Sequence, residues 1–185
     1  MKIIVCPGMH SPRLTDTFIA GLDRPEQTFV IFPSDRLPVY SPHHILEFLQ
    51  PHLSQGLPLL WIGFSAGVVG AIAAATQWQT QGGITRSLIA IDGWGVPLYG
   101  NFPIYRLSHD YFTHWSSALL GRGSESFYAD PPVEHLDLWR SPNTIAGYWI
   151  ASPSDPSDMN RDSLSTCSST TAAAFVATLI DRYTD

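Results

Sequence analysis

Five consecutive residues constrain the fold of this chain more than any other segment. Residues 63–67 read Gly-Phe-Ser-Ala-Gly, a Gly-x-Ser-x-Gly pentapeptide with an apolar run on each side. The run before it has the pattern of a short buried strand, and the run after it is rich in small helix formers. A strand, a sharp turn and a helix are the context in which this pentapeptide presents an exposed serine. We therefore expect Ser65 at the carboxyl end of a strand and the amino terminus of a helix, where the helix dipole favours developing negative charge.

Short apolar segments alternate with helical segments along most of the chain. The strand-like segments cover residues 2–6, 28–32, 57–62, 87–91 and 144–150. The helix-like segments cover residues 14–22, 42–53, 66–79 and 172–183, and Asp130 with Pro131 is typical of one more helix start. This alternation predicts the α/β class: a three-layer α/β/α sandwich with a mostly parallel sheet.

Length and composition predict a single domain over residues 1–185. The chain is 44% hydrophobic and only 14% charged, which suits a globular protein with a sizeable core. Seven aromatic side chains fall between residues 94 and 115, and we expect an aromatic-rich, lid-like insertion around residues 93–130. Residues 152–170 are rich in Ser, Asp and Pro and predict a surface loop.

Charge and cysteine content exclude several classes of protein. A net charge of −6 with a single lysine argues against nucleic-acid binding, which needs a basic face. Two cysteines, Cys6 and Cys167, are too few for a disulfide framework. The apolar stretches are too short for a membrane span, and a strand that begins at Lys2 leaves no room for a signal peptide. We expect a cytoplasmic protein.

Three patches of the chain resemble the α/β-hydrolase superfamily. The first is the pentapeptide around Ser65. The second is residues 6–10, Cys-Pro-Gly-Met-His, which is similar to the loop that supplies an oxyanion donor in that family, with Pro7 where the family often has histidine. The third is residues 90–94, Ala-Ile-Asp-Gly-Trp, which is similar to the strand end that carries the acid in some lipases and thioesterases. The resemblance implies an α/β-hydrolase-like sheet with a reduced number of strands. It also implies hydrolysis of an ester or thioester through an acyl-serine intermediate.

Ser65 is the expected nucleophile, and it needs a base and an acid. A serine hydroxyl is a poor nucleophile without an adjacent base. The acid orients the imidazole and stabilises its charged form. Asp92 suits this role because it ends the strand that follows the nucleophile strand, while Asp110 and Asp130 are alternatives.

Three histidines follow Ser65 and could be the base. In the family the histidine comes last along the chain, and His135 is the last histidine here, followed by apolar residues and a helix-like segment. His109 is the stronger candidate if residues 131–141 form a crossover helix, and His114 is the third. The strand-like segment 144–150 is followed by no histidine, although the family usually keeps one there.

The remaining site predictions concern the oxyanion hole, metals and the substrate. The resemblance places the oxyanion donors on the backbone N–H groups of Ala66 and Met9, with His10 as an alternative to Met9. The chain has no His-Glu-x-x-His signature and no cysteine pair, so we expect no metal and no cofactor. The expected partner is a small-molecule acyl ester or thioester. A non-catalytic module that binds a ligand or partner on the same fold is the alternative, and acyl transfer would use the same residues.

Overall fold

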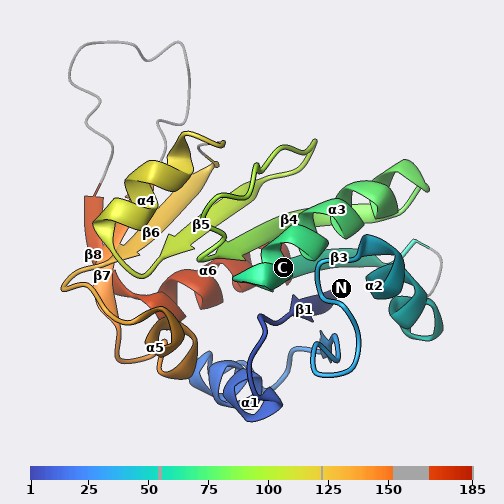
Figure 1. The fold of residues 1–185 in the computed structure, drawn as a ribbon, viewed down its shortest axis with the longest axis horizontal. Coiled ribbons are helices and arrows are strands. Elements are labelled where there is room, and N and C mark those ends of the chain that lie inside the picture. The colour runs from blue at the N-terminus through green and yellow to red at the C-terminus, as the bar shows by residue number, and fades with distance from the viewer. Residues whose placement is uncertain (54–55, 122, 152–166, 185) are drawn as a thin grey trace.

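One sheet of eight strands organises the chain in the computed structural model (Figure 1). The structure describes residues 1–53, 56–121, 123–151 and 167–184. Six neighbouring strands are parallel in the order β2-β1-β3-β4-β5-β6, and β7 and β8 extend the sheet in antiparallel fashion. The strands are β1 (Lys2–Cys6), β2 (Phe29–Ile31), β3 (Pro58–Phe64), β4 (Ile84–Ile91), β5 (Ile104–Ser108), β6 (Glu125–Ala129), β7 (Ala146–Ala151) and β8 (Cys167–Thr171). The predicted α/β class with a mostly parallel sheet is confirmed.

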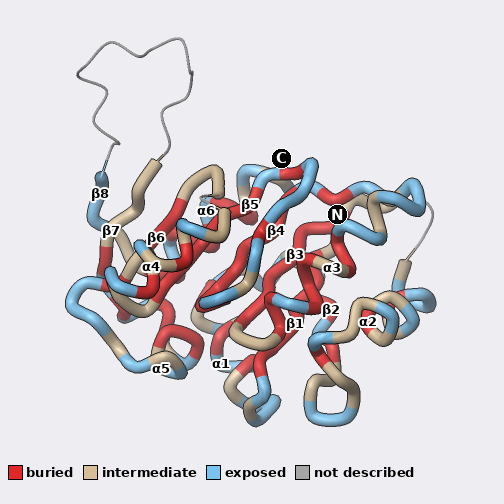
Figure 2. The backbone as a smooth tube through the Cα atoms, turned by 45° about the horizontal axis from the view of Figure 1, so that its top comes forward, coloured by how far each residue is buried: buried red, intermediate tan, exposed pale blue. Residues whose placement is uncertain are grey.

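The two faces of the sheet carry separate apolar cores. Successive side chains of a strand point to opposite faces, so Ile3 and Val5 of β1 join one core while Ile4 and Cys6 join the other. Helices α1 (Pro12–Gly21), α5 (His135–Arg140) and α6 (Ala172–Thr184) pack on the first face, the lower side of the sheet in Figure 1. Helices α2 (Pro42–Leu49) and α3 (Ala66–Thr80) pack on the second face. Figure 2 shows the result, with the central strands buried and the connecting segments exposed.

The segment 93–130 differs from the predicted lid-like insertion. It contains strands β5 and β6 of the central sheet, joined by helix α4 (Tyr111–Ala118). Arg106 lies in the middle of β5 and is buried, with its guanidinium donating hydrogen bonds to the carbonyls of Leu120 and Gly121. A buried charged residue interrupts the apolar pattern by which a central strand is recognised.

The carboxyl-terminal part of the chain holds two further differences. The sheet has eight strands instead of a reduced number, and β8 occupies residues predicted to be loop, while residues 152–166 of that predicted loop lie outside the described residues. Helix α5 begins at His135, whereas the sequence predicts a helix start at Asp130 and Pro131. The Asp130 amide instead donates to the carbonyl of Ala146, which keeps this segment beside β7.

The parallel strands β3, β4 and β5 end level with one another. Phe64 pairs with Ile91, and Ile91 pairs with Leu107. The next residues continue the ladder, because the amide of Ser65 donates to Ile91 and the amide of Asp92 donates to Leu107. The residues that follow these three strands therefore meet at one edge of the sheet, where open α/β sheets bind ligands. Each helix in the described parts of the chain is too short or too polar to cross a bilayer.

Candidate active site

Ser65 occupies a strained turn between β3 and α3. Its φ of 53° and ψ of −123° place it among only three non-glycine residues with positive φ in the described chain. The tight approach of helix to strand explains the glycine two residues later. A Cβ atom at Gly67 would lie 2.0 Å from the carbonyl oxygen of Cys6, so a side chain there would collide with backbone. The pentapeptide thus holds Ser65 at the amino terminus of α3, as the sequence predicts.

The loop after β1 packs directly on this serine. A Cβ atom at Gly8 would lie 3.1 Å from Cβ of Ser65 and 3.0 Å from the ring of Phe64. Within the described residues, no hydrogen bond uses the backbone amide of Met9 or of Ala66. The amide of Ala66, the residue after Ser65, and the amide of Met9, in the loop that packs on the serine, are therefore both without a partner. The backbone amide of His10, the alternative to Met9, is engaged, because it donates to the carbonyl of Gly8 at 3.1 Å. The His10 ring packs against the rings of Phe64 and Trp139.

Asp92 follows β4 in the same strained manner, with a φ of 49°. Its side chain is only 1% exposed, yet both carboxylate oxygens accept hydrogen bonds. Oδ1 accepts from the backbone N–H of His109 at 2.9 Å, and Oδ2 accepts from Nδ1 of His109 at 2.9 Å and Nδ1 of His135 at 2.8 Å. Burial raises the pKa of the Asp92 carboxyl, but the hydrogen bonds from the two histidines outweigh burial and hold the pKa below its ordinary value.

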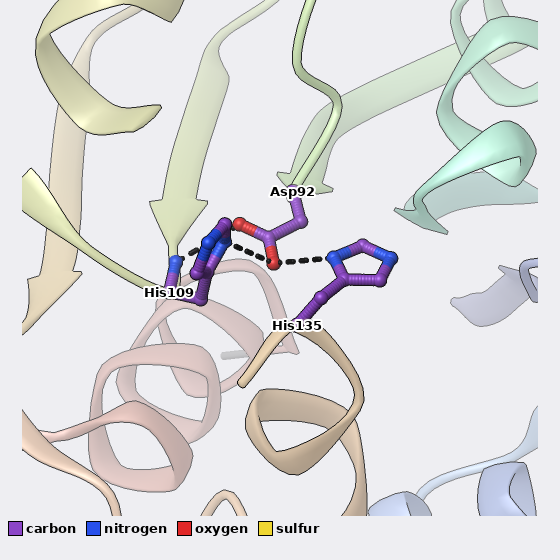
Figure 3. A group of neighbouring side chains, drawn as sticks. All are labelled: Asp92, His109 and His135. Carbon is purple, nitrogen blue, oxygen red and sulfur yellow. Dashed lines mark hydrogen bonds and ion pairs between the residues drawn. The ribbon is translucent and has the colours of Figure 1, made fainter. Parts of the chain in front are cut away.

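Two different elements bring the two histidines to Asp92. His109 follows β5, the strand beside β4, while His135 is the first residue of α5. The segment before α5 is tied to this edge by a hydrogen bond from the amide of Val133 to the carbonyl of His109 at 3.1 Å. Figure 3 shows the two imidazoles reaching the carboxylate from opposite sides.

The two histidines differ in what surrounds Nε2, the ring nitrogen that does not contact Asp92. Nε2 of His109 faces Asp110, whose Oδ2 lies 3.6 Å away. The ring of His135 stacks on Phe64, the neighbour of Ser65, with centroids 4.8 Å apart. Because Nδ1 of His135 donates to Asp92, the neutral ring leaves Nε2 as a proton acceptor, and Figure 3 shows this nitrogen pointing away from the carboxylate. Among the described residues, no hydrogen bond joins the Ser65 hydroxyl to either imidazole.

A pocket of about 380 Å³ opens over these groups. Its polar lining residues are Ser65, Asp92, His109 and His135, and Ala66, the residue after Ser65, also lines the pocket. Its other wall is mainly apolar and is formed by Val69, Trp94, Val96, Phe112 and Thr113. Trp94 and Phe112 are each more than 60% exposed, so the pocket is bordered by aromatic surface. Part of the aromatic segment therefore lines the site, although β5 and β6 belong to the sheet.

The other candidates lie outside this cluster or at its margin. His114 packs its ring on Tyr128 with centroids 5.1 Å apart, and burial lowers its pKa. Asp130 is exposed, and within the described residues only its amide takes part in a hydrogen bond. Asp110 caps α4 by accepting from the amide of Thr113, with its second oxygen toward His109. The structure thus brings Ser65, Asp92, His135 and His109 together and leaves His114 and Asp130 apart.

Asp92, His109 and His135 are also the described residues that could hold a metal ion. Their donor atoms lie within 4.8 Å of one another. The sequence predicts no metal and does not identify this group of three residues. Two imidazoles and a carboxylate are ligands that several divalent metals accept. The same Nδ1 atoms are engaged in hydrogen bonds to Asp92, so a metal would have to replace both bonds.

The sequence predictions treat His109 and His135 as alternatives, whereas the structure has both on one carboxylate. The sequence pattern does not predict strand β5. Had β5 been recognised beside β4, His109, the residue directly after β5, would have been expected near Asp92. No model of a known protein family matches this chain, and no curated protein matches it significantly.

Proposed function

We propose that this protein is a serine hydrolase that cleaves an ester or thioester through an acyl-serine intermediate. One observation carries the proposal: Asp92 accepts a hydrogen bond from Nδ1 of His135 in a pocket that Ser65 also lines. A carboxylate, an imidazole and a hydroxyl in this order form the arrangement that activates a serine nucleophile. On this proposal the fold is a three-layer α/β/α sandwich of the α/β-hydrolase kind.

The proposed reaction assigns one role to each group. Ser65 Oγ attacks the acyl carbon while Nε2 of His135 takes its proton. The amides of Met9 and Ala66 donate to the oxyanion that forms, and each such donor typically contributes about 3 kcal/mol to the transition state. The alcohol or thiol leaves with the proton from His135. Water then attacks the acyl-enzyme, His135 accepts its proton, and the acid departs as Ser65 is restored.

The apolar wall of the pocket indicates the kind of substrate. Val69, Val96 and the rings of Trp94 and Phe112 offer no charged partner, so they suit an uncharged apolar acyl or aryl group. Among the described residues of this wall, no cationic side chain is available to hold a phosphate. We expect a small-molecule substrate and no cofactor.

Labelling with a fluorophosphonate probe tests the proposal. The wild-type protein should be labelled, and mass spectrometry should locate the adduct on Ser65. The Ser65→Ala variant should not be labelled, whereas Ser11→Ala, which removes an exposed hydroxyl next to His10, should be labelled at the wild-type rate. Labelling and turnover that survive a chelator would argue against a metal on Asp92 and the histidines. A Ser65→Ala protein that is still labelled would refute the assignment.

A non-catalytic binding module is the second candidate, favoured by the lack of a hydrogen bond between Ser65 and an imidazole in the described residues. Such a module would bind an apolar ester without labelling or turnover. Isothermal titration with a non-hydrolysable ester analogue, combined with the labelling and turnover assays, separates the two, because the module would bind the analogue and show neither labelling nor turnover. Acyl transfer is tested by product analysis with added alcohol or amine acceptors.

A further inference from the structure

Helix α4, which lies beside β6 in Figure 1, has the reverse of the usual arrangement of side chains. Its two buried residues, Thr113 and Ser117, are small and polar. Its large apolar side chains are instead more than half exposed, and they are Tyr111, Phe112, Trp115 and the C-cap Leu119. With about 3.6 residues per turn, these four lie within one arc of about 100°, opposite the buried pair. A helix normally turns such a stripe toward a core, so the exposed face of α4 indicates an external partner.

The exposed face of α4 continues into the pocket of the candidate active site. Phe112 lines that pocket together with Trp94 and Val69, which are also exposed. The rings of Phe112 and Trp115 have centroids 6.4 Å apart. The indole N–H of Trp94 donates to the hydroxyl of Ser116 at 3.2 Å, which holds the loop after β4 against α4. These side chains form one surface, the aromatic patch, which consists of Val69, Trp94, Tyr111, Phe112, Trp115 and Leu119.

The composition of the aromatic patch suits the boundary between lipid and water. Tryptophan and tyrosine have an apolar body and a polar tip, so they are favoured at the level of the headgroups, while phenylalanine and leucine enter the apolar region. The patch contains no charged residue, and helix α4 contains no Lys, Arg, Asp or Glu. The chain carries a net charge of −6, so an anionic membrane would repel it. A membrane surface without net charge is therefore the matching partner.

A second copy of this chain fits the aromatic patch less well. A stable protein–protein interface takes about 20–30 residues from each partner, whereas the patch supplies only a few large side chains. A copy seated there would also cover the pocket that Val69, Trp94 and Phe112 line. A lipid surface does not need a large complementary area, because binding strength follows the apolar area that enters it.

We propose that the aromatic patch binds the surface of a membrane of uncharged lipid. Binding through α4 and Trp94 holds the pocket over Ser65 at that surface, where an apolar ester collects. The binding itself follows from the patch. The membrane as the source of an ester substrate rests on the proposed function.

The double variant Trp115→Ala/Leu119→Ala tests this inference. Both side chains are more than half exposed and neither lines the pocket, so the fold and the hydrolysis of a dissolved ester should be retained. Tyr40→Ala/Ile84→Ala is the matched control, because it also removes one exposed aromatic and one exposed aliphatic side chain. Tyr40 precedes α2, and Ile84 is the first residue of β4, so both lie outside the aromatic patch.

Vesicles of phosphatidylcholine are the probe, and co-sedimentation measures the binding. The wild type and the control should bind, and Trp115→Ala/Leu119→Ala should bind at least roughly tenfold more weakly, because two apolar side chains no longer enter the lipid. Replacing about a third of the lipid by phosphatidylglycerol should weaken binding at low salt. Bromine atoms on the acyl chains should quench the tryptophan emission of the wild type, a measurement that needs no variant.

Hydrolysis separates the membrane-bound ester from the dissolved one. With an apolar ester carried in the vesicles, turnover by Trp115→Ala/Leu119→Ala should fall in parallel with its binding. Its turnover of a water-soluble acetate ester should stay within about twofold of the wild type.

Several results would overturn the inference. A wild-type protein that does not sediment with phosphatidylcholine, or a Trp115→Ala/Leu119→Ala variant that binds as tightly as the wild type or as the control, would do so. Tighter binding to the anionic vesicles would also contradict it. Ultracentrifugation that finds a wild-type dimer and a monomeric double variant would assign the patch to a second copy.

Vesicle binding is measured without turnover, so the two proposals fail separately. A wild-type protein that binds the vesicles but neither labels nor hydrolyses esters would refute the proposed function and support the membrane surface. A protein that hydrolyses dissolved esters and ignores the vesicles would do the reverse.

Discussion

At the scale of single residues, Asp92 carries a negative charge in an almost fully buried position. Three hydrogen bonds compensate for the water that it has lost, and two of them come from side chains that can themselves become positive. A buried charge that loses such partners is strongly destabilising. Substitutions at this carboxylate therefore change both the chemistry of the site and the stability of the fold.

Asp92→Asn should lower kcat/KM by about 10³–10⁴-fold, because an amide can donate as well as accept and no longer holds His135 in the tautomer that leaves Nε2 free. Ester hydrolysis and the rate of fluorophosphonate labelling both measure this loss. Asp130→Asn is the control, since Asp130 is exposed and lies outside the cluster, and its activity should stay within about twofold of the wild type. Comparable losses in the two variants would contradict the assignment of the acid.

The pH dependence of stability should have opposite signs for His109 and His114. The pKa of His109 is raised in the fold, so its contribution is fully present below the ordinary histidine pKa and is lost as the pH rises through the folded-state pKa. The difference in unfolding free energy between the wild type and His109→Asn should therefore shrink from pH 6 to pH 9.

Burial lowers the pKa of His114, so the unfolded chain binds this proton more tightly than the fold does. His114→Asn should therefore gain stability relative to the wild type as the pH falls from 7 to 5. Urea titrations at a series of pH values measure both differences. If the unfolding free energies of both variants, relative to the wild type, changed in the same direction with pH, the opposite pKa shifts of His109 and His114 would be contradicted.

At the scale of elements, the junction of β3 and α3 depends on close backbone contact. Gly67→Ala would place a methyl group 2.0 Å from the carbonyl oxygen of Cys6, so α3 must move away from β1. We expect a loss of about 1–3 kcal/mol in unfolding free energy, together with a displaced Ser65 and slower labelling. Gln77→Ala, at an exposed position of the same helix, should change stability by less than about 0.5 kcal/mol. Urea denaturation of both variants provides the comparison, and equal midpoints would mean that the junction tolerates a side chain.

A comparison of the predicted and observed strands shows how much of the fold the sequence predicts. The strands that precede Ser65 and Asp92 end in continuous apolar runs, so their carboxyl ends and the residues there are predictable. Strand β5 contains the buried Arg106, and β8 reads Cys-Ser-Ser-Thr-Thr at the edge of the sheet, so neither has an apolar pattern. Without β5, His109 is not recognisable as a neighbour of Asp92. The position of His135 depends on a loop hydrogen bond, from Val133 to His109, that no local pattern encodes.

At the scale of the whole molecule, one buried ring joins the elements beneath the site. Trp139 of α5 is fully buried and stacks on Phe18 of α1 at 3.7 Å and on Phe64 of β3 at 4.7 Å. The ring of His10 lies 6.0 Å from it. The helix that carries His135 and the loop that packs on Ser65 thus rest on the same indole.

Trp139→Ala should therefore destabilise the protein by about 3–5 kcal/mol, the usual range for removing a buried tryptophan. It should also reduce labelling of Ser65 at temperatures where the protein remains folded, because both His135 and the loop lose their support. Trp115→Ala removes a tryptophan that is more than half exposed and should have little effect on the unfolding free energy. Calorimetry and labelling of the two variants test this, and a similar melting temperature for both would exclude a central role for Trp139.

The backbone at Ser65 has a consequence for the molecule as a whole. A residue with a side chain is held there in a conformation that glycine adopts at no steric cost, and the surrounding sheet and helix must supply the energy to keep it so. A chain with glycine at residue 65 would therefore fold under less strain, but it would lack the hydroxyl that we propose as the nucleophile. A less relaxed native state thus goes together with a half-buried serine that lines the pocket over Asp92.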